Sequence, residues 1–407
     1  MYLGFLLILA VVFIIVSTTK LNLHPFLALL FAAFGFGLCA RMPLPDIVDS
    51  VNKGFGGTIG YIGIVIVCGT IIGTFLEKSG GAFAMAKSIL GIMGKKNVPF
   101  AMATIGFFVS IPVFCDSGFV ILSPLGKALA KQAKVSLAAC AIALSLGLYA
   151  THTMVPPTPG PIAAAGILGA DLGQVIGWGI LASLSALVIS CLFAVKYAAR
   201  IHIDPAPDQS DADLEQKLKE APSSAKAFTP ILLPIILIVL KSIADLPSKP
   251  FGAGGFSTGI GFVGHPVVAL LIGVLIAFTL PKRLDTSMFS ASGWVGQALV
   301  NSAIIILITG AGGAFGKILQ NSGIADVIGE SVADMKLGVW LPFLIAAAIK
   351  TAQGSSTVAI ITTASLMEPM MNSLGFDSSA ARALVVVIIG AGSMVVSHAN
   401  DSFFWVV

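Results

Sequence analysis

The chain has 407 residues, of which 57% are hydrophobic and only 10% are charged. Its mean hydropathy is +0.99, and a soluble domain carries about 25% charged residues. A soluble globule of this length could not cover its surface with so few charges. Apolar runs long enough to cross a bilayer recur along the whole chain. The composition therefore predicts an all-α polytopic membrane protein whose solvent is the lipid bilayer.

The net charge of +4 is small and spread over many loops, which excludes the basic footprint of a nucleic-acid-binding protein. The five cysteines lie in apolar segments without CxxC spacing, so we expect small buried side chains and no disulfide framework. The HExxH motif of zinc metalloproteases does not occur. These patterns disfavour an enzyme, and we expect no metal and no cofactor.

In chain order, the apolar segments predict membrane spans at 3–18, 24–40, 58–76, 136–165, 174–195, 228–245, 264–280, 298–319 and 380–407. Two further apolar segments, 99–126 and 338–371, are interrupted by polar residues at their centres. The one long polar stretch, 200–227, is rich in proline and in charges of both signs. We expect it to form a cytoplasmic linker, and a short amphipathic helix within it is an alternative to plain coil.

Lysines flank segment 99–126 on both sides, and cytoplasmic loops are enriched in Lys and Arg. Those before it are Lys78, Lys87, Lys95 and Lys96, and those after it are Lys127, Lys131 and Lys134. Both flanks should therefore face the cytoplasm, so that the segment enters and leaves on the same side as a re-entrant hairpin. Because successive spans cross the membrane in alternating directions, the acidic loop 320–337 should lie outside, and 338–371 should be a hairpin entered from outside.

The two halves of the chain resemble each other. Gly73–Gly80 matches Gly316–Gly323 at four of eight positions. In each half a polar-tipped hairpin follows and then a span that is interrupted at a histidine, His152 or His398. The same order of features with opposite starting sides predicts two inverted-topology repeats.

This repeat divides the chain into three parts. The first repeat is 1–199, with hairpin 99–126 and broken span 136–165, and the linker is 200–227. The second repeat is 228–407, with hairpin 338–371 and broken span 380–407. The repeat also predicts a terminal helix after Val407 as the counterpart of 174–195.

Irregular backbone at membrane depth persists only where protein or a wet cavity surrounds it. Four polar breaks have this character: Cys115–Gly118, Thr151–Gly160, Gln353–Thr357 and Ser397–Ser402. Half-helix N-termini there would aim backbone N–H groups at anions. Converging at the midplane, the four breaks would form a small cavity for a polar solute, with an anion favoured.

The ionisable residues at these breaks predict proton coupling. A carboxylate at bilayer depth costs roughly 2.5–3.5 kcal/mol, so Asp116 is expected to be a proton carrier or substrate ligand, or else a helix cap. His152 and Asp401 complete the proton-coupling candidates. Asp401 follows His398 by three residues, so the two could share a helix face or form a structural pair.

The predicted substrate-binding residues gather at the same breaks. Lys350 would attract a carboxylate, or else extend to the outer interface. The hydrogen-bonding candidates are Ser117, Gly118, Thr153, Thr158, Gln353, Gly354, Ser355, Ser356, Thr357, His398, Asn400 and Ser402. For any hydroxyl among them the alternative is a bond to a backbone carbonyl one turn earlier.

Four motifs resemble those of the gluconate permease (GntP) family of bacterial proton symporters, in the ion transporter superfamily. They are Pro112–Gly118, His152–Gly160, Ala352–Ala359 and Ser397–Ser402. The resemblance implies a homodimeric elevator-type transporter in the bacterial inner membrane, with a re-entrant hairpin and a broken helix in each inverted repeat. It also implies symport of a proton with a small hydroxylated carboxylate, such as gluconate or a related sugar acid.

Two departures and several alternatives accompany this resemblance. The chain is shorter than typical members, in line with the expected terminal helix, and Ser355–Ser356 stands where Ser-Ala is expected. Sodium coupling, or transport of D-serine or another hydroxy acid, would use the same fold. A channel would need a continuous polar stripe on several helices, and an intramembrane enzyme would use Ser355 or Cys115 as nucleophile.

Overall fold

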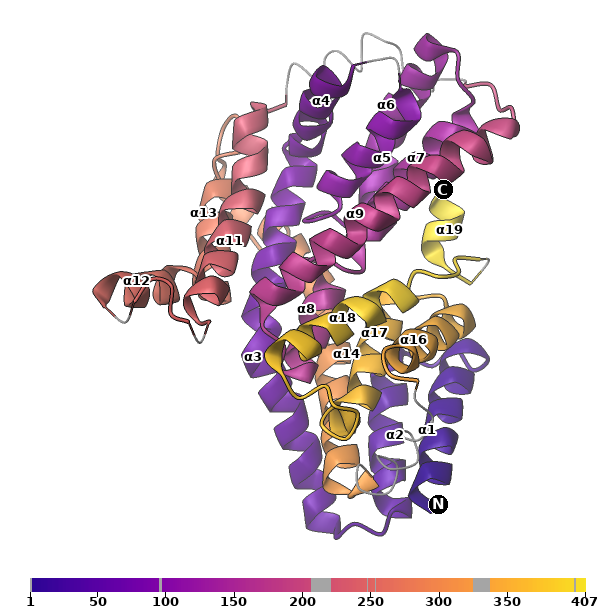
Figure 1. Cartoon of the computed structure of the whole chain (residues 1–407), viewed down its shortest axis with the longest axis vertical. Coiled ribbons are helices and arrows are strands. Elements are labelled where there is room, and N and C mark those ends of the chain that lie inside the picture. Colours follow the sequence, from indigo (N-terminus) through magenta and orange to yellow (C-terminus); the bar gives the residue numbers. More distant parts are fainter. Residues whose placement is uncertain are drawn as a thin grey trace. The chain divides into compact units, whose positions relative to one another are not determined.

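The computed structural model describes residues 2–94, 97–205, 221–246, 248–252, 254–324, 337–398 and 400–407. Within these ranges every regular element is a helix, as Figure 1 shows. The expected all-α fold is therefore confirmed. The interior of the predicted linker, 206–220, and most of the predicted outer loop 320–337 lie outside the described residues, as do Lys95 and Lys96.

The helices of the first part of the chain follow one another with short connections. They are α1 (Tyr2–Thr19), α2 (Pro25–Cys39), α3 (Leu44–Lys78), α4 (Gly81–Met93), α5 (Val98–Val109), α6 (Cys115–Ala133), α7 (Leu137–His152), α8 (Pro159–Leu168) and α9 (Leu172–Lys196), followed by the 3₁₀ turn η1 (Ala198–Arg200).

The second part begins after residue 220. Its elements are α11 (Ser224–Ala244), α12 (Gly255–Val263), α13 (Pro266–Ala277), η2 (Thr286–Phe289), α14 (Trp294–Asn321), α16 (Trp340–Gln353), α17 (Ser356–Met367), η3 (Glu368–Met370), α18 (Ser379–Gly392) and α19 (Ser402–Val406).

Five described helical segments are long and apolar enough to cross a membrane by themselves: those of α1, α3, α9, α11 and α14. α13 corresponds to the span expected at 264–280, but α12 precedes it at a bend of 62° that the sequence pattern did not predict. Pro266 at the start of α13 explains the bend. It has no N–H to continue a helix, and it disfavours helical backbone at His265, whose ψ is 130°.

The helices are interrupted within three of the four expected polar breaks. The fourth, Cys115–Gly118, forms the first turn of α6, and the interruption lies directly before it. α5 and α6 are separated by 110–114, α7 and α8 by 153–158, α16 and α17 by 354–355, and α18 and α19 by 393–401. The direction in which each hairpin enters the bilayer stays a prediction.

The chain forms two compact units. Unit 1 comprises Met1–Ile66, Pro159–Val175 and Ser302–Ser402, and unit 2 comprises Val67–Thr158, Ile176–Asn301 and Phe403–Val407. Each unit contains segments from both halves of the sequence. The two units therefore do not correspond to the two predicted repeats, each of which is one continuous stretch of sequence. Two of the points at which the chain changes unit, after Thr158 and after Ser402, lie inside the expected broken spans 136–165 and 380–407.

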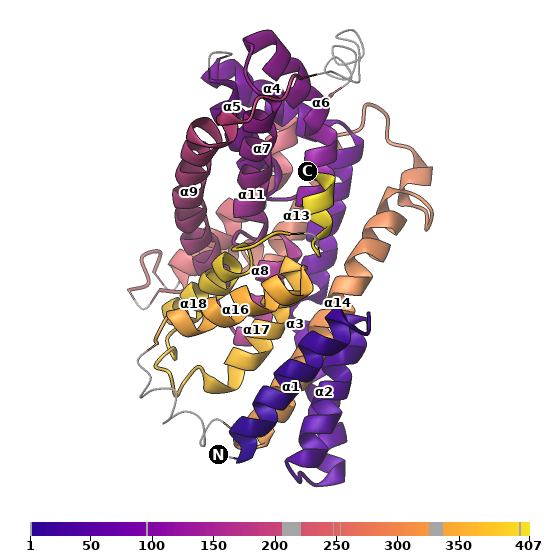
Figure 2. The ribbon, with the colours of Figure 1, turned by 90° about the vertical axis from the view of Figure 1, so that its right-hand side faces the viewer.

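In unit 1, the second hairpin is built into a bundle. α16 packs against α17 and α18, α17 and α18 both pack against α8, and α1 packs against α2 and α16 (Figures 1 and 2). Nearly every residue of α17 is buried, including Thr362, Thr363 and Ser365. The core of this unit therefore surrounds the second helix of the hairpin and holds its N-terminal end in place.

In unit 2, the first hairpin packs on the helix that follows it. α5 and α7 make the most extensive contact, and α6 also packs against α7. Gly106 and Gly147 permit the close approach, because a Cβ at either position would overlap backbone atoms of the other helix. Thr151 adds a hydrogen bond, from its Oγ1 to the Phe107 carbonyl oxygen at 2.9 Å.

All five cysteines are free thiols. Four of them are buried, as their apolar surroundings predicted, but Cys39 is exposed and corrects that expectation. Cys39 ends α2 next to Leu38, which is also exposed. Apolar side chains on the outer faces of a membrane protein contact lipid, so an apolar sequence context does not imply burial within the protein.

Candidate functional site

The break in the second hairpin depends on one glycine. Gly354 ends α16 with a φ of +87°, and its N–H donates to the Lys350 carbonyl. Such left-handed backbone costs a residue with a Cβ roughly 1–2 kcal/mol. Ser355 then begins α17, because its Oγ accepts a hydrogen bond from the Val358 N–H at 3.4 Å. One helix therefore ends and the next begins within two residues, Gly354 and Ser355.

Side chains from the break at 393–401 complete the exposed end of α16. Asn400 Nδ2 donates to the carbonyls of Thr351 and Ala352 at 3.0 and 3.1 Å. His398 Nε2 lies 2.9 Å from the same Thr351 oxygen, so that nitrogen must carry the proton. The last carbonyls of a helix have no partners within it, and lipid cannot supply them. Hairpin tip and broken span therefore form one hydrogen-bonded structure.

The same two segments, α16 and the break at 393–401, also form a buried ion pair. Lys350 has 0% of its side chain exposed, and its Nζ lies 2.7 Å from Asp401 Oδ2. The same ammonium donates to the Gly354 carbonyl at 2.5 Å. Ser397 Oγ donates to Asp401 Oδ2 at 2.6 Å. Because Lys350 is fully buried, it does not extend to an interface, which was the alternative considered from sequence.

The remaining predicted residues of unit 1 lie close in the sequence to Lys350 or to Asp401. Gln353 ends α16, and its Nε2 is buried without a hydrogen-bond partner among the described residues. Ser356 is buried in the first turn of α17, Thr357 follows it, and Ser402 begins α19. A buried amide donor that no described group satisfies is available to a bound solute.

Unit 2 brings together the first hairpin tip and the first broken span. Phe114 precedes α6, and its ring centroid lies 5.9 Å from that of His152, the last residue of α7. Asp116 occupies the first turn of α6, where the helix dipole favours a negative charge. The Oδ1 atom of Asp116 and the Nδ1 atom of His152 are both buried. Ser117 and Gly118 follow Asp116 in the same turn.

The two predicted threonines of unit 2 donate to backbone carbonyls close to them in sequence. Thr153 Oγ1 donates to the Tyr149 carbonyl at 3.3 Å, and Thr158 Oγ1 donates to the Val155 carbonyl at 2.6 Å. Both side chains are buried. These local bonds match the alternative considered for isolated hydroxyls, and they stabilise the irregular segment 153–158.

Two groups in this hydrogen-bonded cluster were not predicted as site residues. The Thr351 carbonyl accepts from both His398 and Asn400, and Ser397 donates to Asp401. The Thr351 carbonyl could not have been found, because every residue carries a carbonyl. For Ser397 the signal was the spacing of four residues from Asp401.

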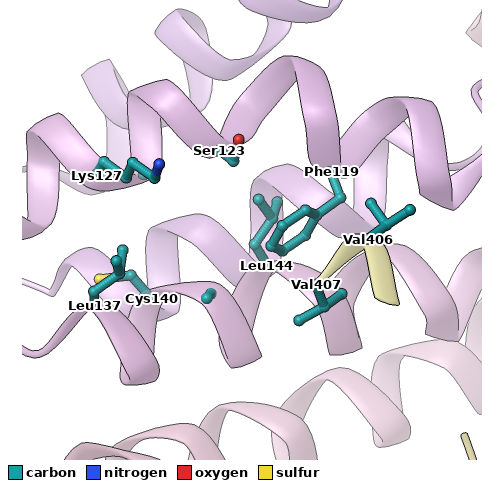
Figure 3. A pocket seen from close by; sticks show the side chains of 10 residues that line it. Phe119, Ser123, Lys127, Leu137, Cys140, Leu144, Val406 and Val407 are labelled. Carbon is teal, nitrogen blue, oxygen red and sulfur yellow. The ribbon is translucent and has the colours of Figure 1, made fainter. Parts of the chain in front are cut away.

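The described pockets lie away from these clusters. In unit 1 a groove of about 470 Å³ is lined by glycines and by Lys53, Lys317, Gln320 and Glu368. In unit 2 a smaller pocket of about 190 Å³ lies between α6 and α7, with Lys127 towards one end and Val407 towards the other (Figure 3). Neither contains a predicted site residue. Among the described residues no three His, Cys, Asp or Glu side chains group as metal ligands.

Apolar helices that break around hydrogen-bonding residues and a buried ion pair define a membrane transporter. The model of the GntP family permeases matches residues 2–407. The chain therefore belongs to the GntP permease family, which confirms the resemblance drawn from its motifs. It is a multi-pass membrane permease and not an enzyme.

Curated relatives agree over nearly the whole chain. A gluconate permease of Pseudomonas aeruginosa is 36% identical over 97% of this chain and 87% of its own length. The D-serine transporter DsdX of Escherichia coli is 34% identical over 98% of this chain and 89% of its own length. The YdaH transporter of Alcanivorax borkumensis, whose crystal structure is described as having an unusual topology, has a similar fold. Its TM-score is 0.56 at 15% identity, over 90% of this chain and 81% of that one.

Proposed function

We propose that this permease is a secondary active symporter that imports a small hydroxylated carboxylate, such as gluconate or a related sugar acid, together with protons. Several relatives carry the name gluconate permease at 30–36% identity. We place the protein in the bacterial inner membrane, where the relative YgbN of Escherichia coli is named as a permease. Linker 200–227 would face the cytoplasm.

The observation that carries this proposal is the buried ammonium of Lys350 at the hairpin tip. A lysine that the protein encloses completely needs an anionic partner. Asp401 supplies it in this structure at 2.7 Å, and a carboxylate substrate offers the same chemical group. The unsatisfied Gln353 amide and the hydroxyl groups of Ser355, Ser356 and Thr357 are donors for a hydroxylated solute.

We assign proton coupling to Asp116, His152 and Asp401. The other substrate-binding residues would be Ser117, Gly118, Thr153, Thr158, Gly354, His398, Asn400 and Ser402. Inverted repeats at 1–199 and 228–407 would supply two nearly equivalent states for alternating access, with an elevator movement in a homodimer.

A second candidate is transport of D-serine or another small hydroxy acid, which the relationship to DsdX favours. D-serine shares the carboxylate and a hydroxyl with the sugar acids but adds an ammonium group. Coupling to Na⁺ is the alternative to coupling to protons.

Uptake into proteoliposomes tests both choices. Gluconate, other sugar acids, D-serine and lactate would each be supplied in labelled form, with and without a pH gradient. We expect saturable uptake of a sugar acid that an alkaline interior drives. Uptake that depends on Na⁺ alone would contradict proton coupling, and flux without saturation would identify a channel.

A further inference from the structure

We propose that the carboxylate of the substrate displaces Asp401 from Lys350, so that Asp401 takes up one proton for each carboxylate bound. This inference rests on the proposed function and assigns its coupling step to one exchange of partners. Lys350 would pair with the Asp401 carboxylate before substrate binds and with the substrate carboxylate afterwards. The aspartate would hold the site neutral when no substrate is bound.

The first support is the geometry of the pair. Lys350 Nζ donates to Asp401 Oδ2 at 2.7 Å and to the Gly354 carbonyl at 2.5 Å. The Gly354 bond attaches the ammonium to the hairpin tip itself. When Asp401 leaves, the lysine can therefore keep its position and present its charge to a carboxylate beside the unsatisfied Gln353 amide.

The second support is charge balance. The ammonium and the carboxylate sum to zero, and both side chains are buried, Asp401 with 5% of its surface exposed. Adding a substrate anion would leave one uncompensated negative charge in a site shielded from water, which is costly. One proton from the solvent on Asp401 removes that charge. The site then holds Lys350 as ammonium, the substrate as carboxylate and Asp401 as neutral acid, with a net charge of zero again.

The third support is that Asp401 has a partner in both states. Ser397 Oγ donates to Asp401 Oδ2 at 2.6 Å. A hydroxyl can also accept a hydrogen bond from a protonated carboxyl. The neutral aspartic acid therefore need not be left without a hydrogen bond when Lys350 turns to the substrate.

Few other charged or titratable side chains lie on the described helices that pack against α16 or in the break that carries Asp401. Among the described helix contacts, α16, which carries Lys350, packs against α1, α17 and α18, and the break at 393–401 carries Asp401. α1 and α17 contain no acidic or basic residue. Arg382 of α18 donates to the Leu168 carbonyl and to Asn372. His398 is the other titratable side chain of the break, and it is exposed and bonded to the Thr351 carbonyl. Ser397 and Asn400 of the same break are exposed.

The test measures proton uptake when gluconate is added to the purified permease in weakly buffered detergent solution. The wild type should take up one proton per gluconate, and its Kd should rise by up to tenfold per pH unit. Asp401→Asn should still bind gluconate but take up no proton, with a Kd that no longer depends on pH. Lys350→Gln should weaken binding by at least tenfold.

Asp245→Asn is the matched control, because it removes the carboxylate of another short Lys–Asp pair, Lys241–Asp245, in unit 2. It should leave proton uptake and Kd unchanged. If Asp401→Asn does not fold, the double variant Lys350→Gln/Asp401→Asn leaves no unpaired charge and should lose both binding and proton uptake.

Two results would overturn the exchange while leaving the transporter proposal intact. One is stoichiometric proton uptake by Asp401→Asn upon gluconate binding. The other is full proton-coupled binding by the double variant. If the wild type bound none of gluconate, other sugar acids, D-serine or lactate, the proposed function would fail, and this inference with it.

Discussion

Gly354 lies directly against Asn400, so closely that a Cβ on the glycine would overlap the Asn400 carbonyl oxygen. The contact joins the tip of the second hairpin to the break between α18 and α19. These segments are nearly fifty residues apart in sequence, and both belong to unit 1. Hydrogen bonds from Asn400 and His398 reinforce the contact on the α16 side. The hairpin tip is thus defined by a segment that does not belong to the hairpin.

Replacing Gly354 with alanine should disrupt this tip. The methyl group meets the Asn400 backbone, and the φ of +87° is strained for any residue with a Cβ. Left-handed backbone alone costs roughly 1–2 kcal/mol, and the overlap adds to it. We expect a lower melting temperature in detergent and loss of substrate uptake.

The matched control is Gly56→Ala, in α3 of the same unit. A Cβ at Gly56 meets no atom within 4 Å, and alanine is favoured over glycine in a helix by about 1 kcal/mol. This variant should melt at the same or a higher temperature and keep its uptake. A Gly354→Ala protein with unchanged melting and unchanged uptake would show that the tip is not constrained as described.

Asn400→Ala should loosen the end of α16 without unfolding the protein. It removes the donor to the Thr351 and Ala352 carbonyls, at a cost of about 1 kcal/mol for each bond lost. We expect faster amide hydrogen exchange at Gly354 and Ser355. Asn97→Ala is the control, because Asn97 precedes α5 without a capping side-chain bond in the described structure. Equal exchange at the tip in both variants would contradict a capping role.

The sequence predicted the breaks but not how they pair. Polar residues inside apolar runs located three of the four interruptions, because lipid tolerates irregular backbone only where its polar groups are satisfied. The remaining interruption, 110–114, lies directly before the expected break Cys115–Gly118. The partner of Lys350 could not be predicted, since Asp401 lies 51 residues away and the choice depends on how α16 packs on α18. The bend before α13 was also missed, although Pro266 marked it.

In unit 2, the packing of α7 on α5 should depend on one hydroxyl. Thr151 Oγ1 donates to the Phe107 carbonyl in the last turn of α5, where helix carbonyls lack partners of their own. Thr151→Val keeps the shape of the side chain but leaves the buried carbonyl without this donor, at a cost of about 1–3 kcal/mol. We expect a measurable fall in melting temperature.

Thr104→Val provides the comparison. Thr104 Oγ1 is exposed and donates only within its own helix, to the Phe100 carbonyl, so its loss should change stability little. If both valine variants melted like the wild type, the link between α5 and α7 would contribute nothing to stability.

Asp116 allows the sharpest test of proton coupling in unit 2. Asparagine has nearly the same shape and keeps an oxygen for hydrogen bonds at the start of α6, but it cannot carry a proton between two charge states. If Asp116 carries the coupled proton, Asp116→Asn should lose accumulation of substrate against a gradient while still exchanging external for internal substrate. If Asp116 only stabilises the helix terminus, the variant should lose no more than about 0.3–1 kcal/mol of stability. It would then accumulate substrate normally. Counterflow and gradient-driven uptake in the same proteoliposomes separate these outcomes, because only the second requires the proton.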